Sequence, residues 1–130
     1  MAAITFGTPG NVGTPGTLTH ATSISVNATS DADLDFSTRT TGFVTVAITP
    51  GATISAVRGV LVEFFRQYST TTSNFETIAA SAYTYTMPCA VASTLESKTI
   101  TFPPGKWKIQ LTNLDATYDV TYSITADYLA

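Results

Sequence analysis

The chain has 130 residues, enough for one domain with a buried core, and only 12% of them are charged. The net charge is −3 and the six Lys and Arg residues are scattered, which argues against nucleic acid as a partner because nucleic acid requires a clustered basic face. The longest aliphatic run, Val60-Leu61-Val62, falls far short of the roughly 20 residues that cross a bilayer, so we expect no membrane partner.

The first segment, residues 1–20, carries a two-copy repeat in which Gly7-Thr-Pro-Gly10 recurs as Gly13-Thr-Pro-Gly16. Proline fixes φ and glycine permits turns, so the repeat disfavours a helix. We therefore predict an extended N-terminal arm at residues 1–20, ahead of a domain at residues 21–130. The arm is either a poorly ordered terminus or a segment that crosses onto a neighbouring subunit. The second interpretation gives it six contact residues: Ile4, Phe6, Pro9, Val12, Pro15 and Leu18.

Alternating apolar and polar residues predict β-strands along most of the remaining chain, because the side chains of a strand point to opposite faces in turn. We expect strands at residues 23–27, 31–37, 40–49, 77–87, 95–102, 107–111 and 118–128. Turn signals such as Pro50-Gly51 and Pro103-Pro-Gly105 separate them, and the 26 Thr residues favour extended backbone. The sequence thus predicts an all-β fold, a two-sheet antiparallel β-sandwich of about eight strands. A jelly roll and an immunoglobulin-like Greek key fit equally well.

The segment 57–68 fits two structures. Its apolar residues, among them Val57, Val60, Leu61 and Phe64, fall at helical spacing, with charged residues on the opposite side. As a strand, the segment would be apolar on both faces, as in a central strand that is buried on both sides. Gly59 and the concentration of Val and Phe favour the strand.

Three carboxylates at alternate positions, Asp31, Asp33 and Asp35, resemble part of a calcium-binding loop. That loop also requires glycine at its sixth position and a glutamate at its twelfth, where this chain has Phe36 and Gly42. The intervening apolar residues fit an exposed strand with one dry face. We therefore expect no metal at this string.

Candidate catalytic groups are few. The lone cysteine, Cys89, ends an apolar run and fits a buried small residue, and the single histidine, His20, lies near the predicted arm. The sequence shows no Ser-His-Asp set, zinc-ligand spacing, phosphate-binding loop or dinucleotide fingerprint. We therefore expect no enzyme and no cofactor. The Met start without signal-peptide features favours synthesis in the cytosol, although a secreted domain with an added Met would look the same.

Aromatic residues suggest one alternative function, a carbohydrate-binding or adhesin module. Tyr83 and Tyr85 share a face of their predicted strand with small residues, so they are the better candidates for an exposed pair that stacks on sugar rings. Trp107 would join this glycan platform if it were exposed, but it lies in register with Ile109 and Leu111 and is first a core residue.

The Thr-rich, weakly charged composition, the Met start, the Gly-Thr-Pro-Gly repeat and the compact β-body together resemble small virion proteins of tailed bacteriophages, in particular capsid cement or decoration proteins. The resemblance implies a non-enzymatic structural protein at the capsid surface of a virion. Its partners would be the major capsid protein or other virion subunits, and it would form a symmetric homo-oligomer, often a trimer. Separately, the residues from Pro103 to Thr112 and the Tyr118 strand resemble the closing hairpin of many extracellular β-sandwich modules, including sugar-binding ones.

Overall fold

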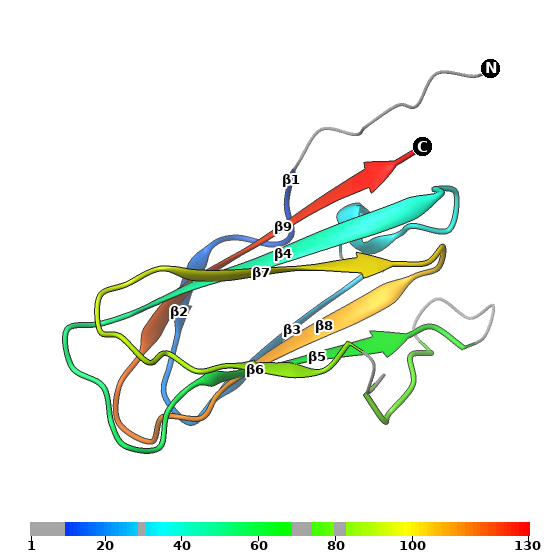
Figure 1. Ribbon diagram of the computed structural model, residues 1–130. Helices are drawn as coiled ribbons and strands as arrows, with labels where there is room; N and C mark the ends of the chain where they lie inside the picture. Colours follow the sequence, from blue (N-terminus) through cyan, green and yellow to red (C-terminus); the bar gives the residue numbers. More distant parts are fainter. Residues whose placement is uncertain (1–9, 29–30, 69–73, 80–82) are drawn as a thin grey trace.

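The computed structural model describes residues 10–28, 31–68, 74–79 and 83–130. Two antiparallel sheets pack face to face, as predicted for a β-sandwich (Figure 1). Sheet A contains β1 (Gly10–Asn11), β2 (Gly16–Leu18), β4 (Thr41–Pro50), β7 (Glu96–Phe102) and β9 (Val120–Leu129). Sheet B contains β3 (Ser23–Asn27), β5 (Val60–Arg66), β6 (Tyr85–Met87) and β8 (Trp107–Asn113).

The strand order identifies which sandwich this is. Sheet A has the order β1-β9-β4-β7, with β2 also paired to β9, and sheet B has the order β3-β8-β5-β6. We set aside the short β1 and count β2 as the first of eight strands. Sheet A then has the order first, eighth, third, sixth, and sheet B has the order second, seventh, fourth, fifth. In a jelly roll, neighbouring strands of each sheet come in turn from the first and the second half of the chain. An immunoglobulin domain instead has the two sheets ABED and CFG. The fold is therefore a jelly roll.

The core lies between the sheets and contains most of the inward residues that the alternation predicted, although Tyr118, at the start of the predicted last strand, is exposed. In β4 every second residue is buried, and in β8 the buried positions are Trp107, Ile109, Leu111 and Asn113. The last strand, β9, buries Val120, Ile124 and Ala126. For residues 57–68 the strand interpretation is confirmed. Residues Val60–Arg66 form β5, a central strand that pairs with β8 at one edge and with β6 at the other.

The segment 31–37 differs from the predicted strand. Residues Ala32–Leu34 form a 3-10 helix, η1, because the side chain of Asp31 accepts a hydrogen bond from the Asp33 amide at 2.9 Å and caps the turn. Leu34 and Phe36 are buried, as the alternation indicated, but Ala32 is exposed. A local hydrogen bond of an aspartate thus decides the backbone here.

Residues 10–18 lie within the predicted N-terminal arm but belong to the sandwich. β1 and β2 pair with β9 of the same chain, and the side chains of Val12 and Leu18 are buried in its core. Gly13, at φ 69°, permits the turn between the two short strands, and its amide donates to Asp31 at 2.7 Å. The side chains of Val12 and Leu18 therefore lie in the core of their own chain, while Pro15 is exposed, and contact of the arm with another subunit stays a prediction. Ile4, Phe6 and Pro9 lie outside the described residues.

Candidate functional site

The residues of the predicted glycan platform are buried or partly buried. Trp107 is 2% exposed, and Tyr83 packs edge-on against it with ring centroids 5.4 Å apart. Tyr85 packs beside Phe64, and the Nζ atom of Lys98 lies 4.4 Å from its ring centroid. Burial raises the pKa of Tyr85 well above its usual range. Trp107 is thus a core residue, as its register indicated, while Tyr83 and Tyr85 are partly buried against Phe102 and Phe64, and glycan binding by this pair stays a prediction.

The other sequence candidates have structural roles. Cys89 is buried, as predicted, and burial raises the pKa of its thiol to about 11, so it stays protonated and is a poor nucleophile at neutral pH. His20 contacts Asp119, with its amide 2.9 Å and its ring Nδ1 2.7 Å from the same carboxylate oxygen. Within the described ranges no group of three His, Cys, Asp or Glu residues is placed to hold a metal ion. No helix in the described chain is long and apolar enough to cross a membrane.

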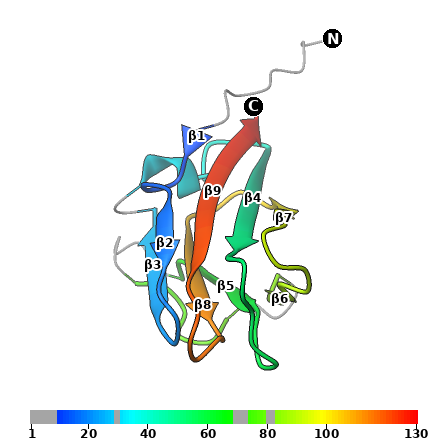
Figure 2. The same cartoon turned by 90° about the vertical axis from the view of Figure 1, so that its left-hand side faces the viewer.

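A surface that the sequence did not reveal lies at one end of the sandwich. The loops 51–59, 88–95 and 114–119 lie there beside the shorter loop 19–22, and the first three are together called the loop end (Figures 1 and 2). The Ser93 amide donates to the Gly51 carbonyl at 3.1 Å, and the Leu114 amide donates to the Gly59 carbonyl at 2.9 Å. These bonds join loops that are 42 and 55 residues apart in the sequence, counted as 93 minus 51 and 114 minus 59.

The loop end carries most of the large apolar side chains that the described chain exposes. Five of the seven lie on its loops, with exposed fractions between 38% and 73%: Val57, Val91, Leu95, Leu114 and Tyr118. The other two, Tyr68 and Ile78, follow β5 at the opposite end of the sandwich. Single exposed apolar residues are normal, but a gathering of them indicates a contact surface.

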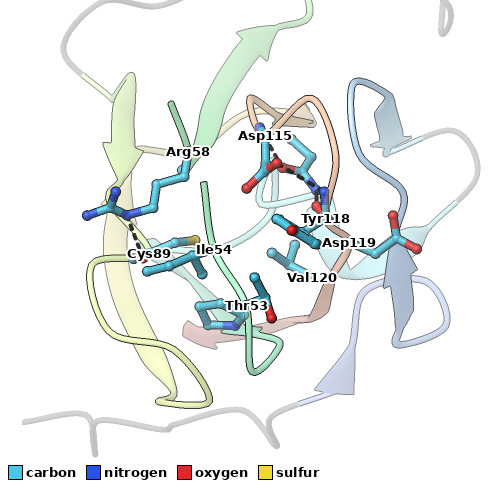
Figure 3. A pocket seen from close by; sticks show the side chains of 11 residues that line it. Thr53, Ile54, Arg58, Cys89, Asp115, Tyr118, Asp119 and Val120 are labelled. Atoms are coloured by element: carbon cyan, nitrogen blue, oxygen red, sulfur yellow. Dashed lines mark hydrogen bonds between the residues drawn. The ribbon is translucent and has the colours of Figure 1, made fainter. Parts of the chain in front are cut away.

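The three charged residues of the loop end are all engaged within the molecule, and Figure 3 shows the hydrogen bonds of Arg58 and Asp115. Arg58 donates to the carbonyl oxygens of Cys89 and Ser55, at 3.2 and 2.8 Å. Asp119 is paired with His20, and hydrogen bonds from His20 lower its pKa. No charge of this surface therefore depends on an external partner.

Asp115 is the third of these charges and is 3% exposed. Burial raises its pKa, but hydrogen bonds outweigh that effect and hold the pKa well below its usual range. Its carboxylate accepts from the amides of Ser55, Thr117 and Tyr118, at 3.2, 2.8 and 3.0 Å. Asp115 thus remains ionised and fixes the loop 114–119 against the loop 51–59.

Asn113, at the end of β8, supports the loop 114–119 from inside the protein. Its Nδ2 donates to the carbonyl oxygens of Leu18 and Tyr118, both at 3.1 Å, and its Oδ1 accepts from the Asp115 amide at 3.0 Å. A buried amide with three such partners satisfies backbone groups that would otherwise be unpaired. The buried side chains of Asn113 and Asp115 therefore form a polar network that joins the loop 114–119 to Leu18 and to the loop 51–59.

The pocket beneath this network is too small for a ligand. Arg58 and Cys89 line one side of it, and Asp115, Tyr118 and Val120 line the other (Figure 3). Its volume is about 10 Å³, roughly the space of one water molecule. The loop end can therefore bind a partner on its surface but cannot enclose a substrate in this pocket.

Comparison with known proteins gives likenesses in structure only. No protein-family model matches the chain, and no curated protein matches it in sequence. The CBM22-1 xylan-binding domain of Xyn10C from Paenibacillus barcinonensis is 11% identical with a TM-score of 0.47, covering 81% of this chain and 62% of that one. The K3 cleaved adhesin domain of Lys-gingipain from Porphyromonas gingivalis is 12% identical with a TM-score of 0.42, covering 69% and 58%.

A viral structure is among the matches as well. The infectious bursal disease virus Gx strain structure is 9% identical with a TM-score of 0.47, covering 98% of this chain and 32% of that one. This chain spans less than two thirds of the length of all three solved chains, at 62%, 58% and 32%. At such identities the likeness concerns the fold and does not assign a function.

Proposed function

We propose that the protein is a non-enzymatic structural protein of a virion, which binds neighbouring capsid subunits through its loop end and so stabilises the shell. The observation that carries this proposal is the gathering of Val57, Val91, Leu95, Leu114 and Tyr118 on three loops of one end. The described residues of that end offer apolar surface, and their charges already have partners. The resemblance to phage cement proteins adds the kind of partner, the major capsid protein.

The physical chemistry of the loop end suits a protein partner. Protein interfaces have cores depleted of charged residues, and burying a charge without a partner is costly. Here the guanidinium of Arg58 and the carboxylate of Asp115 keep their hydrogen bonds when the surface is covered. The network around Asn113 fixes the loops in advance, which reduces the entropy lost on binding.

The proposal includes a symmetric homo-oligomer, and the cement-protein resemblance favours a trimer. Light scattering on the purified protein measures its mass, and co-sedimentation with shells of its virus's major capsid protein measures capsid binding. A strictly monomeric protein without affinity for the shell would contradict the proposal.

Paired substitutions test whether the loop end is the contact. Val57→Ser combined with Leu95→Ser removes two exposed apolar groups from the loop end, and we expect roughly a tenfold or greater loss of shell affinity, as for central interface residues. Tyr68→Ser combined with Ile78→Ser is the matched control at the opposite end and should bind like the wild type. Equal losses in the two double variants would show that the loop end has no special role.

A further inference from the structure

The outer face of sheet A carries almost no charge. The ladder registers and the strand alternation place the following residues on it: Asn11, Thr17, Thr41, Phe43, Thr45, Ala47, Thr49, Ser97, Thr99, Thr101, Thr121, Ser123, Thr125, Asp127 and Leu129. Most are hydroxyl residues. Among these described residues Asp127 is the only charged one and Phe43 the only aromatic one. The two stand directly opposite each other across β4 and β9.

A hollow of about 270 Å³ lies where these two residues meet. It is lined by Phe43, Thr45, Thr99, Thr125, Ala126 and Asp127. The register puts Thr45 between Thr99 and Thr125, so a row of three hydroxyl groups crosses three strands beside the row that contains Phe43 and Asp127. The hollow therefore joins one aromatic ring, one carboxylate and three hydroxyls.

The polar groups of the hollow have hydrogen-bonding capacity to spare. Asp127 Oδ1 accepts from the Tyr128 amide at 2.7 Å, and its Oδ2 has no partner among the described residues. The hydroxyl oxygens of Thr45 and Thr99 lie 2.8 Å apart, so one donates to the other and that other can donate outward. The hollow can thus both accept and donate hydrogen bonds to a ligand.

The shape and chemistry exclude several ligand classes. A peptide strand cannot be added, because the backbone groups of β4 are already paired with β7 and β9. A phosphate or other anion would meet the carboxylate of Asp127, and the residues that line this hollow include no Lys or Arg. A purely apolar ligand would leave the carboxylate and hydroxyls without water or a partner. A sugar ring meets all the conditions, since it has an apolar C–H face and hydroxyl groups at its edge.

We propose that this hollow binds a neutral saccharide, with Phe43 packing against the apolar face of the sugar ring and Asp127 accepting hydrogen bonds from its hydroxyl groups. The site differs from the Tyr83, Tyr85 and Trp107 platform, whose residues lie in sheet B or just before β6 and pack against the core. It also lies in the half of sheet A near the start of β4, whereas the loop end follows Pro50 at the other end of that strand. The hollow therefore stays open to solvent when the loop end is covered by a partner.

Binding to an array of neutral oligosaccharides tests the proposal, with probes built from glucose, galactose, mannose, xylose and N-acetylglucosamine. We expect at least one class to bind, and amide chemical-shift changes on adding it to gather at residues 43–45, 99 and 125–127. Asp127→Asn and Phe43→Ala should each weaken that binding roughly tenfold or more, because each removes one of the two groups that contact the ring.

Matched variants keep the outcome interpretable. Glu63→Gln neutralises a carboxylate on the outer face of sheet B, and Thr49→Val changes a hydroxyl on the outer face of sheet A outside the hollow, so both should bind as the wild type does. Thermal unfolding shows whether Phe43→Ala is folded, and Phe43→Leu replaces it if it is not. A blank array, or unchanged binding by Asp127→Asn and the Phe43 variant, overturns the proposal. Loss of shell binding by the loop-end variants tests only the proposed function, because Val57 and Leu95 do not line the hollow, and saccharide binding by those variants should equal that of the wild type.

Discussion

Replacing Asn113 with leucine isolates the contribution of the buried polar network. Leucine has the same branched shape and the same number of side-chain heavy atoms as asparagine and leaves no cavity, but its methyl groups are bulkier and it makes none of the three hydrogen bonds. The change leaves two carbonyl groups, of Leu18 and Tyr118, and the amide of Asp115 without their partner. Asn113 is 1% exposed, so water does not replace that partner unless the loops move.

The expected cost follows from the number of unpaired groups. Each buried group that loses its partner costs about 1–3 kcal/mol, and relaxation of the loops recovers part of this. We therefore expect a loss of about 3–5 kcal/mol in the free energy of unfolding, out of the about 5–15 kcal/mol typical of a domain. Thr112→Val is the matched control, because Thr112 is the preceding residue and its hydroxyl bonds Ser23 at an exposed position, 2.8 Å away.

Equilibrium unfolding in urea measures the difference in the free energy of unfolding. When the dependence of that free energy on urea concentration is the same for two proteins, the shift in the midpoint concentration reports their difference in stability. We expect Asn113→Leu to unfold at a much lower urea concentration than the wild type, and Thr112→Val to lose less than about 1 kcal/mol. A loss for Asn113→Leu no larger than that of the control would refute the reasoning. It would mean that the loop end does not depend on this side chain.

Two further changes test the packing and the electrostatics. Gly42→Ala should lower the free energy of unfolding by about 1–3 kcal/mol, because its Cβ would lie 2.3 Å from the ring of Phe36. Gly51→Ala is the control and should be neutral, because its Cβ would meet no atom within 4 Å. Equal melting temperatures for the two variants would contradict the close packing of Gly42 against Phe36. The lowered pKa of Asp115 means that the unfolded chain takes up its proton first, so the stabilisation is present above the ordinary pKa of 3.8 and is lost as the pH falls below it. Asp115→Asn should be less stable at pH 7 and lose less stability on acidification, and parallel pH profiles for the two proteins would disprove the role of this carboxylate.

Local patterns in the sequence predicted much of the fold because they depend on near neighbours. The alternation of β4, β8 and β9 identified the inward residues, and the Val and Phe content of residues 60–66 favoured the strand that β5 forms. The burial of Cys89 followed from the apolar run before it. Alternation alone gave a wrong strand at residues 31–37, where the hydrogen bond of Asp31 to the Asp33 amide stabilises a 3-10 turn.

The sites depended on contacts that no local pattern contains. The sequence left Tyr83 and Tyr85 free to be exposed, but they close the gap between the sheets and contact Phe102 and Phe64. Phe43 and Asp127 are 84 residues apart, counted as 127 minus 43, and meet only through the register of β4 with β9. The loop end likewise gathers apolar residues from three distant loops.

The sequence by itself determined that this protein is an antiparallel β-sandwich, because period-two alternation and Thr-rich strands specify a sheet with one dry face. The tertiary structure alone decided between a jelly roll and a Greek key, since either order buries the same inward residues. It also decided that residues 10–18 join sheet A, because the free edge of β9 offers backbone partners and the core accepts Val12 and Leu18. Strand pairing and loop contacts join residues far apart in the chain, so no local pattern in the sequence predicts them.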